Sequence, residues 1–189
     1  MAIPGRRPPA PGRLELVRSF VNTVDIESGA EDLTSPRALA DWLVARNLLP
    51  RGRRLTAQDL ADAIELRETL RDVLQRNAGH AVPAGAAERL DRIAAGVPLR
   101  ARFADGARLE PAEETNAPAS AWLLGAIYQS MVEGTWARLK VCANDTCRWA
   151  FYDSSRNRSG TWCTMAVCGN RMKGRKFRRR HPAHASDAG

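Results

Sequence analysis

Four cysteines near the C-terminal end of the chain are the residues best suited to chemistry. Cys142, Cys147, Cys163 and Cys168 form two pairs with the spacing C-x4-C-x15-C-x4-C. Paired cysteines on two tight turns are typical of tetrahedral zinc sites, although the common zinc knuckle has two intervening residues rather than four. We therefore predict one structural Zn²⁺ ion. Because four sulfurs leave no open coordination position, we expect no catalysis at the metal.

Three other interpretations of these cysteines are a redox-switch pair, an iron centre and plain buried thiols. The N-terminal stretch MAIPGRRPPAPGR has no apolar segment typical of a secretory signal. No apolar run approaches the roughly 18 residues that a membrane span needs. We therefore expect a cytoplasmic protein without a membrane partner, in a reducing compartment where clustered cysteines bind metal more often than they form disulfides.

Residues next to the cysteines suit such a site. Asn144–Asp145 can form the turn within the first pair, and Gly169 follows the last cysteine, where a knuckle often needs a positive φ. Four thiolates around Zn²⁺ carry a local charge of about −2. We expect Lys140, Arg148 and Arg171 to offset that charge.

The positive charge of the chain is confined to the same region. Residues 138–189 contain twelve Lys and Arg against three Asp and Glu, whereas residues 1–137 contain seventeen against eighteen. This asymmetry predicts two functional parts, of which the C-terminal one meets a polyanion. A solvated tail that only aids solubility is the alternative.

We predict a basic helix after the last cysteine, with Val167, Gly174 and Phe177 packing along one seam on the knuckle. Its other faces would meet phosphates or base edges. Arg156 and Arg158, in the loop 154–160, are either a second phosphate contact or part of an ordinary polar turn. Asn170 could read a base, or it could cap the helix. The candidate nucleic-acid-binding residues are Asn170, Arg171, Lys173, Arg175, Lys176, Arg178, Arg179, Arg180, Arg156 and Arg158.

Aromatic residues cluster around the cysteines, at Trp149, Phe151, Tyr152 and Trp162. They could stack on unpaired bases, as in single-strand binders. The interpretation that we favour is a minimal hydrophobic core, since so small a module has little else to bury.

The residues upstream favour helices. Apolar residues repeat at helical spacing over 14–24, and Ser35 and Thr56 are placed to cap helices that start at 36 and 57. Further helices are predicted for 84–95 and for about 118–134, the latter with Met131 facing inward. Leu99, Ala101 and Phe103 alternate with Arg100 and Arg102. Asp105–Gly106 then follows, a pair typical of tight turns, and this pattern predicts a hairpin. The predicted fold is mainly α with a small β-hairpin (α+β), followed by a treble-clef-like four-cysteine finger.

One polar feature of the helical part bears on function. The run Val21-Asn22-Thr23-Val24-Asp25 places polar groups beside a buried-looking face. These groups either line a ligand pocket or form internal hydrogen bonds to a neighbouring helix or hairpin, the interpretation that we favour. Trp42, Trp122 and Trp136 are expected in the core. No nucleophile, base and orienting group occur at a recognisable spacing, so we do not expect an enzyme.

The motif residues also carry a family resemblance. Lys140-Val141-Cys142, the run from Phe151 to Arg158 and Cys168-Gly169-Asn170-Arg171 resemble the CGNR zinc finger. Val21-Asn22-Thr23 and Leu33-Thr34-Ser35-Pro36 with Trp42-Leu43 resemble the ABATE domain. Such proteins are described as stress-induced transcription regulators. The resemblance implies a four-cysteine zinc site and DNA binding by the finger.

The resulting prediction divides the chain into a disordered segment 1–12, an ABATE-like domain 13–137, a finger 138–180 and a disordered tail 181–189. The finger would bind duplex DNA, and the helical domain would sense a small-molecule signal or form a homodimer. The alternatives are an RNA-binding or ribosome-associated zinc protein and a cysteine redox switch.

Overall fold

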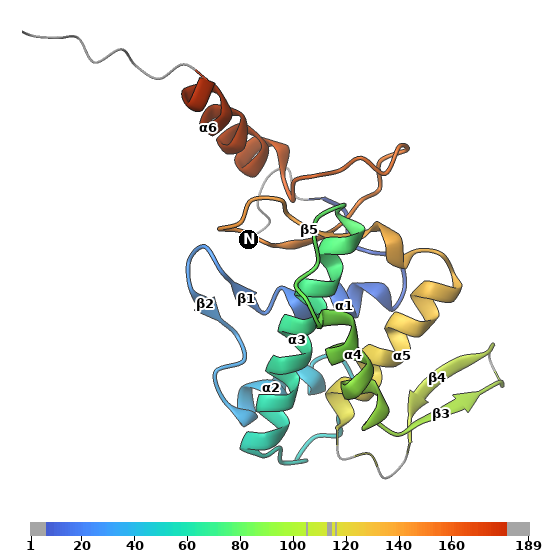
Figure 1. Ribbon diagram of the computed structural model, residues 1–189. Helices are drawn as coiled ribbons and strands as arrows, with labels where there is room; N and C mark the ends of the chain where they lie inside the picture. Colours follow the sequence, from blue (N-terminus) through green and yellow to red (C-terminus); the bar gives the residue numbers. More distant parts are fainter. Residues whose placement is uncertain (1–6, 105, 113–114, 116, 181–189) are drawn as a thin grey trace, which may run out of the picture.

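The computed structural model describes residues 7–104, 106–112, 115 and 117–180 of the chain. The fold is mainly α with small antiparallel sheets, as predicted. Within the described residues, none of the helices has the length and apolar character that a membrane span requires. The elements follow in chain order (Figure 1): α1 Leu14–Val21, β1 Val24–Asp25, β2 Ala30–Glu31, α2 Pro36–Val44, α3 Ala57–Asn77, α4 Ala86–Ala95, β3 Leu99–Arg102, β4 Arg108–Pro111, α5 Pro118–Val132, η1 Trp136–Arg138, β5 Leu139–Val141, β6 Ala150–Tyr152, η2 Met165–Gly169 and α6 Asn170–Arg180.

The starts of α2 and α3 are set by local caps, as predicted. The Ser35 hydroxyl accepts a hydrogen bond from the N–H of Ala38 at 3.1 Å. At α3, the Thr56 hydroxyl accepts from the N–H of Asp59 at 3.1 Å, and the Asp59 carboxylate accepts from the N–H of Thr56 at 2.6 Å. Each cap satisfies N–H groups that the first turn of a helix leaves unpaired.

Helix α1 ends at Val21, earlier than the predicted end at Val24. The N–H and the hydroxyl of Thr23 both donate to the carbonyl of Phe20, at 3.1 and 2.8 Å. Such local bonds offer the backbone an alternative to continuing the helix. Val24 therefore begins β1.

Three hairpins are found among the described residues, where the sequence predicted one upstream of the finger. The predicted one is β3–β4, in which Leu99 pairs with Pro111 and Arg102 with Arg108. The alternating apolar pattern suggested a buried Phe103, but Phe103 lies after the end of β3, with 76% of its surface exposed. The hairpins β1–β2 and β5–β6 have strands of two or three residues, too short to show an alternating pattern.

Helix α5 is buried along most of its length and packs closely on β4. A side chain at Gly125 would place its Cβ 2.6 Å from the carbonyl oxygen of Leu109, so only glycine allows this approach. Leu123 and Ile127 are buried, as predicted. The prediction for Met131 is wrong: the last turn of α5 lies at the surface, and Met131 is 49% exposed.

One hydrophobic core extends from the helical part into the finger. Phe20 and Leu70 of the helices belong to the same buried cluster as Leu139 and Val141 of β5 and Ala150 of β6. Trp136 is also in this core, Trp42 packs against it half-buried, and Trp122 is half-buried. The finger hairpin is therefore packed onto the helical part rather than joined to it by a free linker, while the predicted domain boundary near 137 stays a prediction.

Residues 7–12, predicted to be disordered, lie against the body of the protein. Ala10 is 6% exposed, and its N–H donates to the carboxylate of Glu15 at 2.7 Å. The guanidinium of Arg7 lies 4.7 Å from the ring centroid of Phe151 and donates to the carbonyl of Trp162. The disorder of the segment 1–12 stays a prediction, since proline and glycine content does not reveal the long-range contacts of Arg7. Segments 1–6 and 181–189 lie outside the described residues.

Candidate metal centre

The first cysteine pair lies on the turn that joins β5 to β6. The N–H of Cys142 donates to the carbonyl of Trp149 at 2.9 Å, and the N–H of Cys147 donates to the carbonyl of Asn144 at 2.8 Å. Arg148 then has a φ of 47°, in the left-handed region. The predicted turn at Asn144 thus brings two cysteines with four residues between them to the same end of the hairpin.

The second pair is brought together by a wide helical turn, η2. The Thr164 hydroxyl accepts from the N–H of Val167 at 3.2 Å, and the Thr164 carbonyl accepts from the N–H of Gly169 at 3.1 Å. The latter bond spans five residues, which is the π-helical pattern and is frequent at functional sites. It holds Cys163, just before the turn, and Cys168, within it, on the same side.

The expected positive φ at Gly169 is not found, and the left-handed residue lies instead at Arg148. Gly169 instead leaves little room for a side chain. A Cβ on it would overlap the sulfur of Met165 and lie 3.1 Å from Cδ1 of Trp162. The glycine therefore permits close packing beneath the second cysteine pair.

The four sulfurs form a compact cluster that fits a zinc ion. All four Sγ atoms lie within 4.8 Å of one another, with 3.7 Å between Cys147 and Cys163 and 3.6 Å between Cys163 and Cys168. Zn–S bonds of about 2.3 Å in a tetrahedron give S–S edges of about 3.8 Å. The four residues are at most 9% exposed. The cluster is a metal-binding constellation, and Cys142, Cys147, Cys163 and Cys168 are the residues that would hold the ion.

In the absence of a cation, the close sulfurs favour thiolate at Cys142 and raise the pKa of Cys147 and Cys163. Hydrogen bonds from the thiols of Cys147 and Cys163 lower the pKa of Cys142 to about 2. The bond to Cys142 raises the pKa of Cys147 to about 12, because the two sulfurs share a proton. The side-chain amide of Asn144, which is fully buried, donates to Cys168 Sγ at 3.8 Å. A divalent cation would replace the shared protons and be held by ligands that such bonds orient.

Lys140 does not face the sulfurs, contrary to the prediction. Its ammonium group lies 2.9 Å from the carboxylate of Asp153 and also donates to the carbonyl of Arg158. Asp153 is fully buried, and its carboxylate accepts from the N–H groups of Gly160 and Ser155 at 2.7 and 3.1 Å. Burial opposes its charge, but the hydrogen bond from Lys140, followed by those from Ser155 and Gly160, lowers its pKa well below the usual range. This buried ion pair organises the loop 153–160.

The aromatic residues form the core of the finger, which is the interpretation that the sequence favoured. Phe151 is 2% exposed and packs with the four cysteines, and Trp149 and Trp162 pack half-buried against them. Tyr152 packs instead on the main core. The buried ring of Phe151 is therefore not available as a stacking platform for bases.

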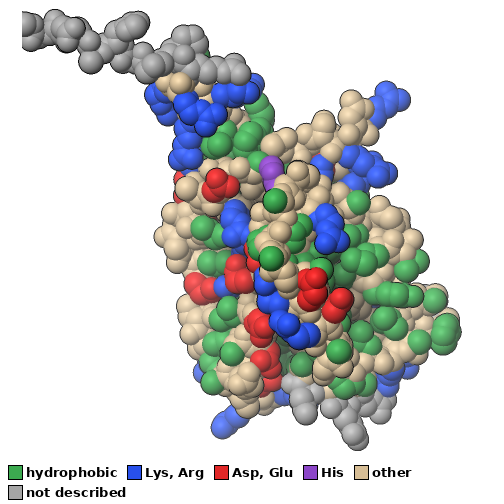
Figure 2. Space-filling model, viewed as in Figure 1, with side chains coloured by type: hydrophobic (Ala, Val, Ile, Leu, Met, Phe, Trp, Pro, Cys, Tyr) green, Lys and Arg blue, Asp and Glu red, His purple; other side chains and the backbone are tan. Residues whose placement is uncertain are grey.

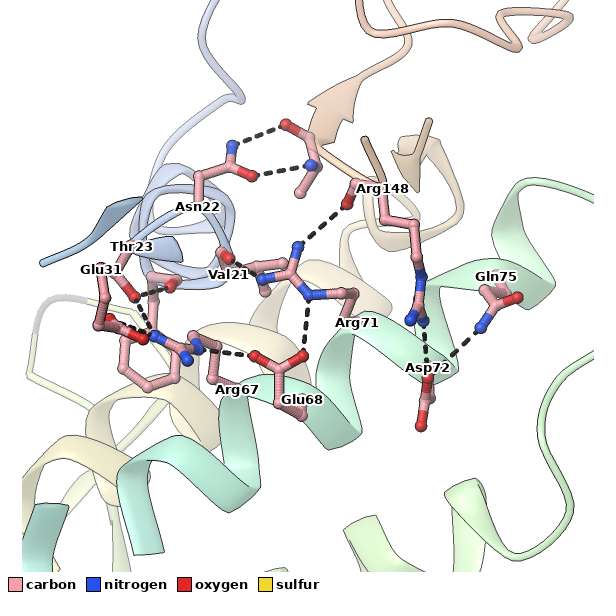
Figure 3. A network of polar contacts seen from close by, with 12 residues as sticks. Val21, Asn22, Thr23, Glu31, Arg67, Glu68, Arg71, Asp72, Gln75 and Arg148 are labelled. Atoms are coloured by element: carbon pink, nitrogen blue, oxygen red, sulfur yellow. Dashed lines mark hydrogen bonds and ion pairs between the residues drawn. The ribbon is translucent and has the colours of Figure 1, made fainter. Parts of the chain in front are cut away.

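A polar network attaches the finger to the helical part (Figure 3). Asn22 donates to the carbonyl of Ala150 and accepts from its N–H, both at 2.8 Å. Arg71, fully buried on α3, donates to the carbonyls of Val21 and Arg148, at 2.5 and 3.0 Å. The favoured prediction for the run Val21 to Asp25, internal hydrogen bonds to a neighbouring helix or hairpin, is confirmed at Asn22.

Two further ion pairs of this network were not foreseen. Arg148, expected to offset the thiolates, directs its guanidinium to Asp72 of α3, at 2.8 Å. Arg67, 4% exposed, bridges Glu31 of β2 at 2.7 Å and the Thr23 hydroxyl at 3.1 Å. Arg67 and Arg71 are four residues apart on the buried side of α3. The only sequence signal for them was a cationic side chain on an otherwise apolar helix face.

Helix α6 projects from the finger, and Figure 2 shows Lys and Arg side chains gathered over it. Its described cations Lys173, Arg175, Lys176, Arg178 and Arg179 are exposed and make no ion pair with any described residue. The side chain of Arg180 is not among those described. The predicted apolar seam is wrong: Val167 and Phe177 are 43% and 63% exposed, because α6 extends beyond the knuckle on which they would pack.

The remaining candidate residues occupy different places. Arg156 and Arg158 are exposed in the loop 153–160, and Arg158 has a φ of 51°. Asn170 donates to the carbonyl of Ala166 at 3.2 Å at the start of α6. The guanidinium of Arg171 pairs with the carboxylate of Glu27 from the β1–β2 turn, and this contact raises the pKa of Arg171. Contact of these residues with nucleic acid stays a prediction.

Fold and site together define a protein in which a mainly helical domain carries a four-cysteine finger. The family model for the CGNR zinc finger matches residues 138–181. The model for the ABATE family, described as "Putative stress-induced transcription regulator", matches residues 14–142. The chain belongs to the ABATE family and ends in a CGNR zinc finger, as its motifs predicted. No curated protein matches the chain.

Proposed function

We propose that this protein is a transcription regulator that binds duplex DNA through α6, with Zn²⁺ held by the four cysteines. The observation that carries the proposal is a set of exposed cations on α6, a helix that begins two residues after Cys168, and these cations form no ion pair with any described residue. A projecting basic helix fixed at one end suits insertion along a phosphate-lined groove. The bound ion would supply a cross-link between the hairpin and this helix, ordering a module that has little core of its own.

Duplex DNA is favoured over unpaired RNA because of the aromatic residues. Recognition of single strands uses exposed rings on which bases stack. In the finger, Phe151 is buried, and Trp149 and Trp162 are packed against the cysteines. The partner that remains for the cationic surface is a regular phosphate backbone.

The helical domain would serve as a sensor or a dimerisation module. A cavity of about 140 Å³ lies where it meets the finger, beside the metal centre. It is lined among others by Arg18 and Glu27 of the helical part and by Trp149 and three of the cysteines, Cys147, Cys163 and Cys168, of the finger. A small-molecule signal bound there would contact both parts of the protein. The rigid hydrogen bonds at Asn22 and Arg71 would transmit such a signal to the finger.

The test is fluorescence anisotropy with a labelled duplex of about 20 base pairs over a series of salt concentrations. The affinity of the zinc-loaded wild type should fall steeply as salt rises. The triple variant Arg175→Gln, Arg178→Gln, Arg179→Gln should bind more weakly, with the slope of log affinity against log salt reduced by up to about 2.7. An unchanged slope would rule out α6 as the contact.

The chain offers a matched control for the change in charge. Arg51, Arg53 and Arg54 are exposed in the α2–α3 connection, at the end of the molecule away from α6 (Figure 1). The triple variant Arg51→Gln, Arg53→Gln, Arg54→Gln should keep the wild-type slope. Competition with single-stranded RNA of the same length completes the test, since about a hundredfold preference for RNA would favour the RNA-binding alternative.

A further inference from the structure

An acidic turn of the helical part is held at the root of the basic helix. The turn joins β1 to β2, and the N–H of Gly29 donates to the carbonyl of Asp25 at 2.8 Å. The carboxylate of Asp25 accepts from the N–H groups of Glu27 and Ser28, at 2.9 and 3.3 Å. These bonds fix the backbone of the turn, so the Glu27 side chain leaves it from a defined position.

The turn is anchored in the polar network of the helical part (Figure 3). The N–H of Asp32 donates to the carbonyl of Thr23 at 2.8 Å, and Glu31 is paired with the buried guanidinium of Arg67 at 2.7 Å. The same network binds the finger through Arg71. The position of the acidic turn relative to α6 is therefore set by both parts of the protein.

The Glu27 carboxylate pairs with the guanidinium of Arg171 in the first turn of α6. Among the described cations of this helix, Arg171 alone has an acidic partner. The two side chains are 42% and 38% exposed, so water and solutes reach the pair. Exposed pairs of this kind are weak and readily exchanged.

We propose that Glu27 is a built-in competitor of nucleic-acid phosphate for Arg171. A carboxylate and a phosphate engage the same guanidinium donors in the same manner, so only one of them can pair fully with Arg171 at a time. The inference rests on the proposed function and adds its regulation: the helical part lowers the affinity of the finger through this contact. A change that displaces the β1–β2 turn raises that affinity.

The test compares Glu27→Gln with Glu65→Gln in anisotropy titrations with the duplex used above. Both variants replace a glutamate by glutamine, so they change the net charge equally. Glu65 is an exposed residue of α3 for which no hydrogen bond or ion pair is found within the described part of the chain. Glu27→Gln should bind about three- to tenfold more tightly than wild type, and Glu65→Gln should stay within about twofold. Equal zinc content and thermal melting of the three proteins would show that folding is unaffected.

The same titrations in an Arg171→Gln background separate competition from general repulsion. In that background Glu27→Gln should bring no further gain, because the disputed guanidinium is absent. A full gain there, or wild-type affinity for Glu27→Gln, would overturn the inference while leaving the proposed function standing. DNA binding by none of the proteins would overturn both.

Discussion

The side-chain amide of Asn22 forms two hydrogen bonds of 2.8 Å with the backbone of Ala150, donating to its carbonyl and accepting from its N–H. Asn22 thereby pairs with the edge of β6 as a residue of a third strand would. Ala150 is fully buried and Asn22 is half-buried, so the backbone groups of Ala150 depend on this side chain for their hydrogen bonds. One side chain of the helical part thus satisfies two backbone groups of the finger hairpin and fixes the position of that hairpin.

Replacement of Asn22 by Ala should therefore destabilise the protein. Both backbone groups of Ala150 would be left buried without partners, and we expect a loss of about 2–4 kcal/mol in the free energy of unfolding. Urea unfolding of the zinc-loaded protein measures it. Asn157→Ala, in the exposed part of the loop 153–160, is the control and should change stability by less than about 0.5 kcal/mol. Equal effects of the two variants would show that the pairing does not support the fold.

Replacement by alanine should change stability in opposite directions at two glycines of the finger. At Gly169 the new Cβ meets Met165 and Trp162, so we expect a loss of about 1–3 kcal/mol and weaker metal binding. At Gly174, within α6, the nearest atom is Nη1 of Arg178 at 3.6 Å, and alanine should favour the helix by up to about 1 kcal/mol.

Thermal melting followed by circular dichroism tests this pair of variants, together with a competition assay for zinc. A stabilised Gly169→Ala protein would contradict the tight packing beneath the second cysteine pair. A loss of helix signal in Gly174→Ala would contradict the helical state of α6.

The buried pair of Asp153 and Lys140 predicts a pH dependence of stability. The pKa of Asp153 is lowered in the folded protein, so its contribution is present above the unfolded pKa of about 3.9 and is lost as pH falls toward the folded value. Asp153→Asn removes this contribution, and we expect it to cost about 3–5 kcal/mol at neutral pH.

The measurement is the difference in free energy of unfolding between wild type and Asp153→Asn from pH 7 to pH 2. It should be constant above about pH 5 and shrink below about pH 4. Protonation of the cysteines affects both proteins alike and cancels in the difference. The exposed Asp41, paired with Arg37 on α2, is the control, and Asp41→Asn should give a small difference throughout. A constant difference down to pH 2 for Asp153→Asn would contradict the lowered pKa.

Features specified within a few residues could be predicted from the sequence. Ser35 and Thr56 cap helices through bonds to residues three positions along the chain, and the cysteine pairs are closed by turns that lie between them. The metal-binding constellation was predicted for the same reason, because both pairs and their spacing are visible in the sequence.

Features that depend on distant partners could not be predicted. Lys140 was assigned to the thiolates, yet its partner is Asp153, across the hairpin β5–β6. Arg71 is separated from Val21 and Arg148 by 50 and 77 positions, and a cation on a helix is ordinarily taken to face water. Only the packing of α3 between α1 and the finger shows why this charge is buried.

The central claim is that a metal held by four thiolates orders the finger and presents α6 to DNA. The most direct measurement is a titration of Zn²⁺ into the metal-free full chain, followed at once by native mass spectrometry and by anisotropy of the labelled duplex. We predict that affinity for the duplex rises with zinc occupancy and saturates at one ion per chain. Undiminished duplex binding by the metal-free protein would contradict the claim.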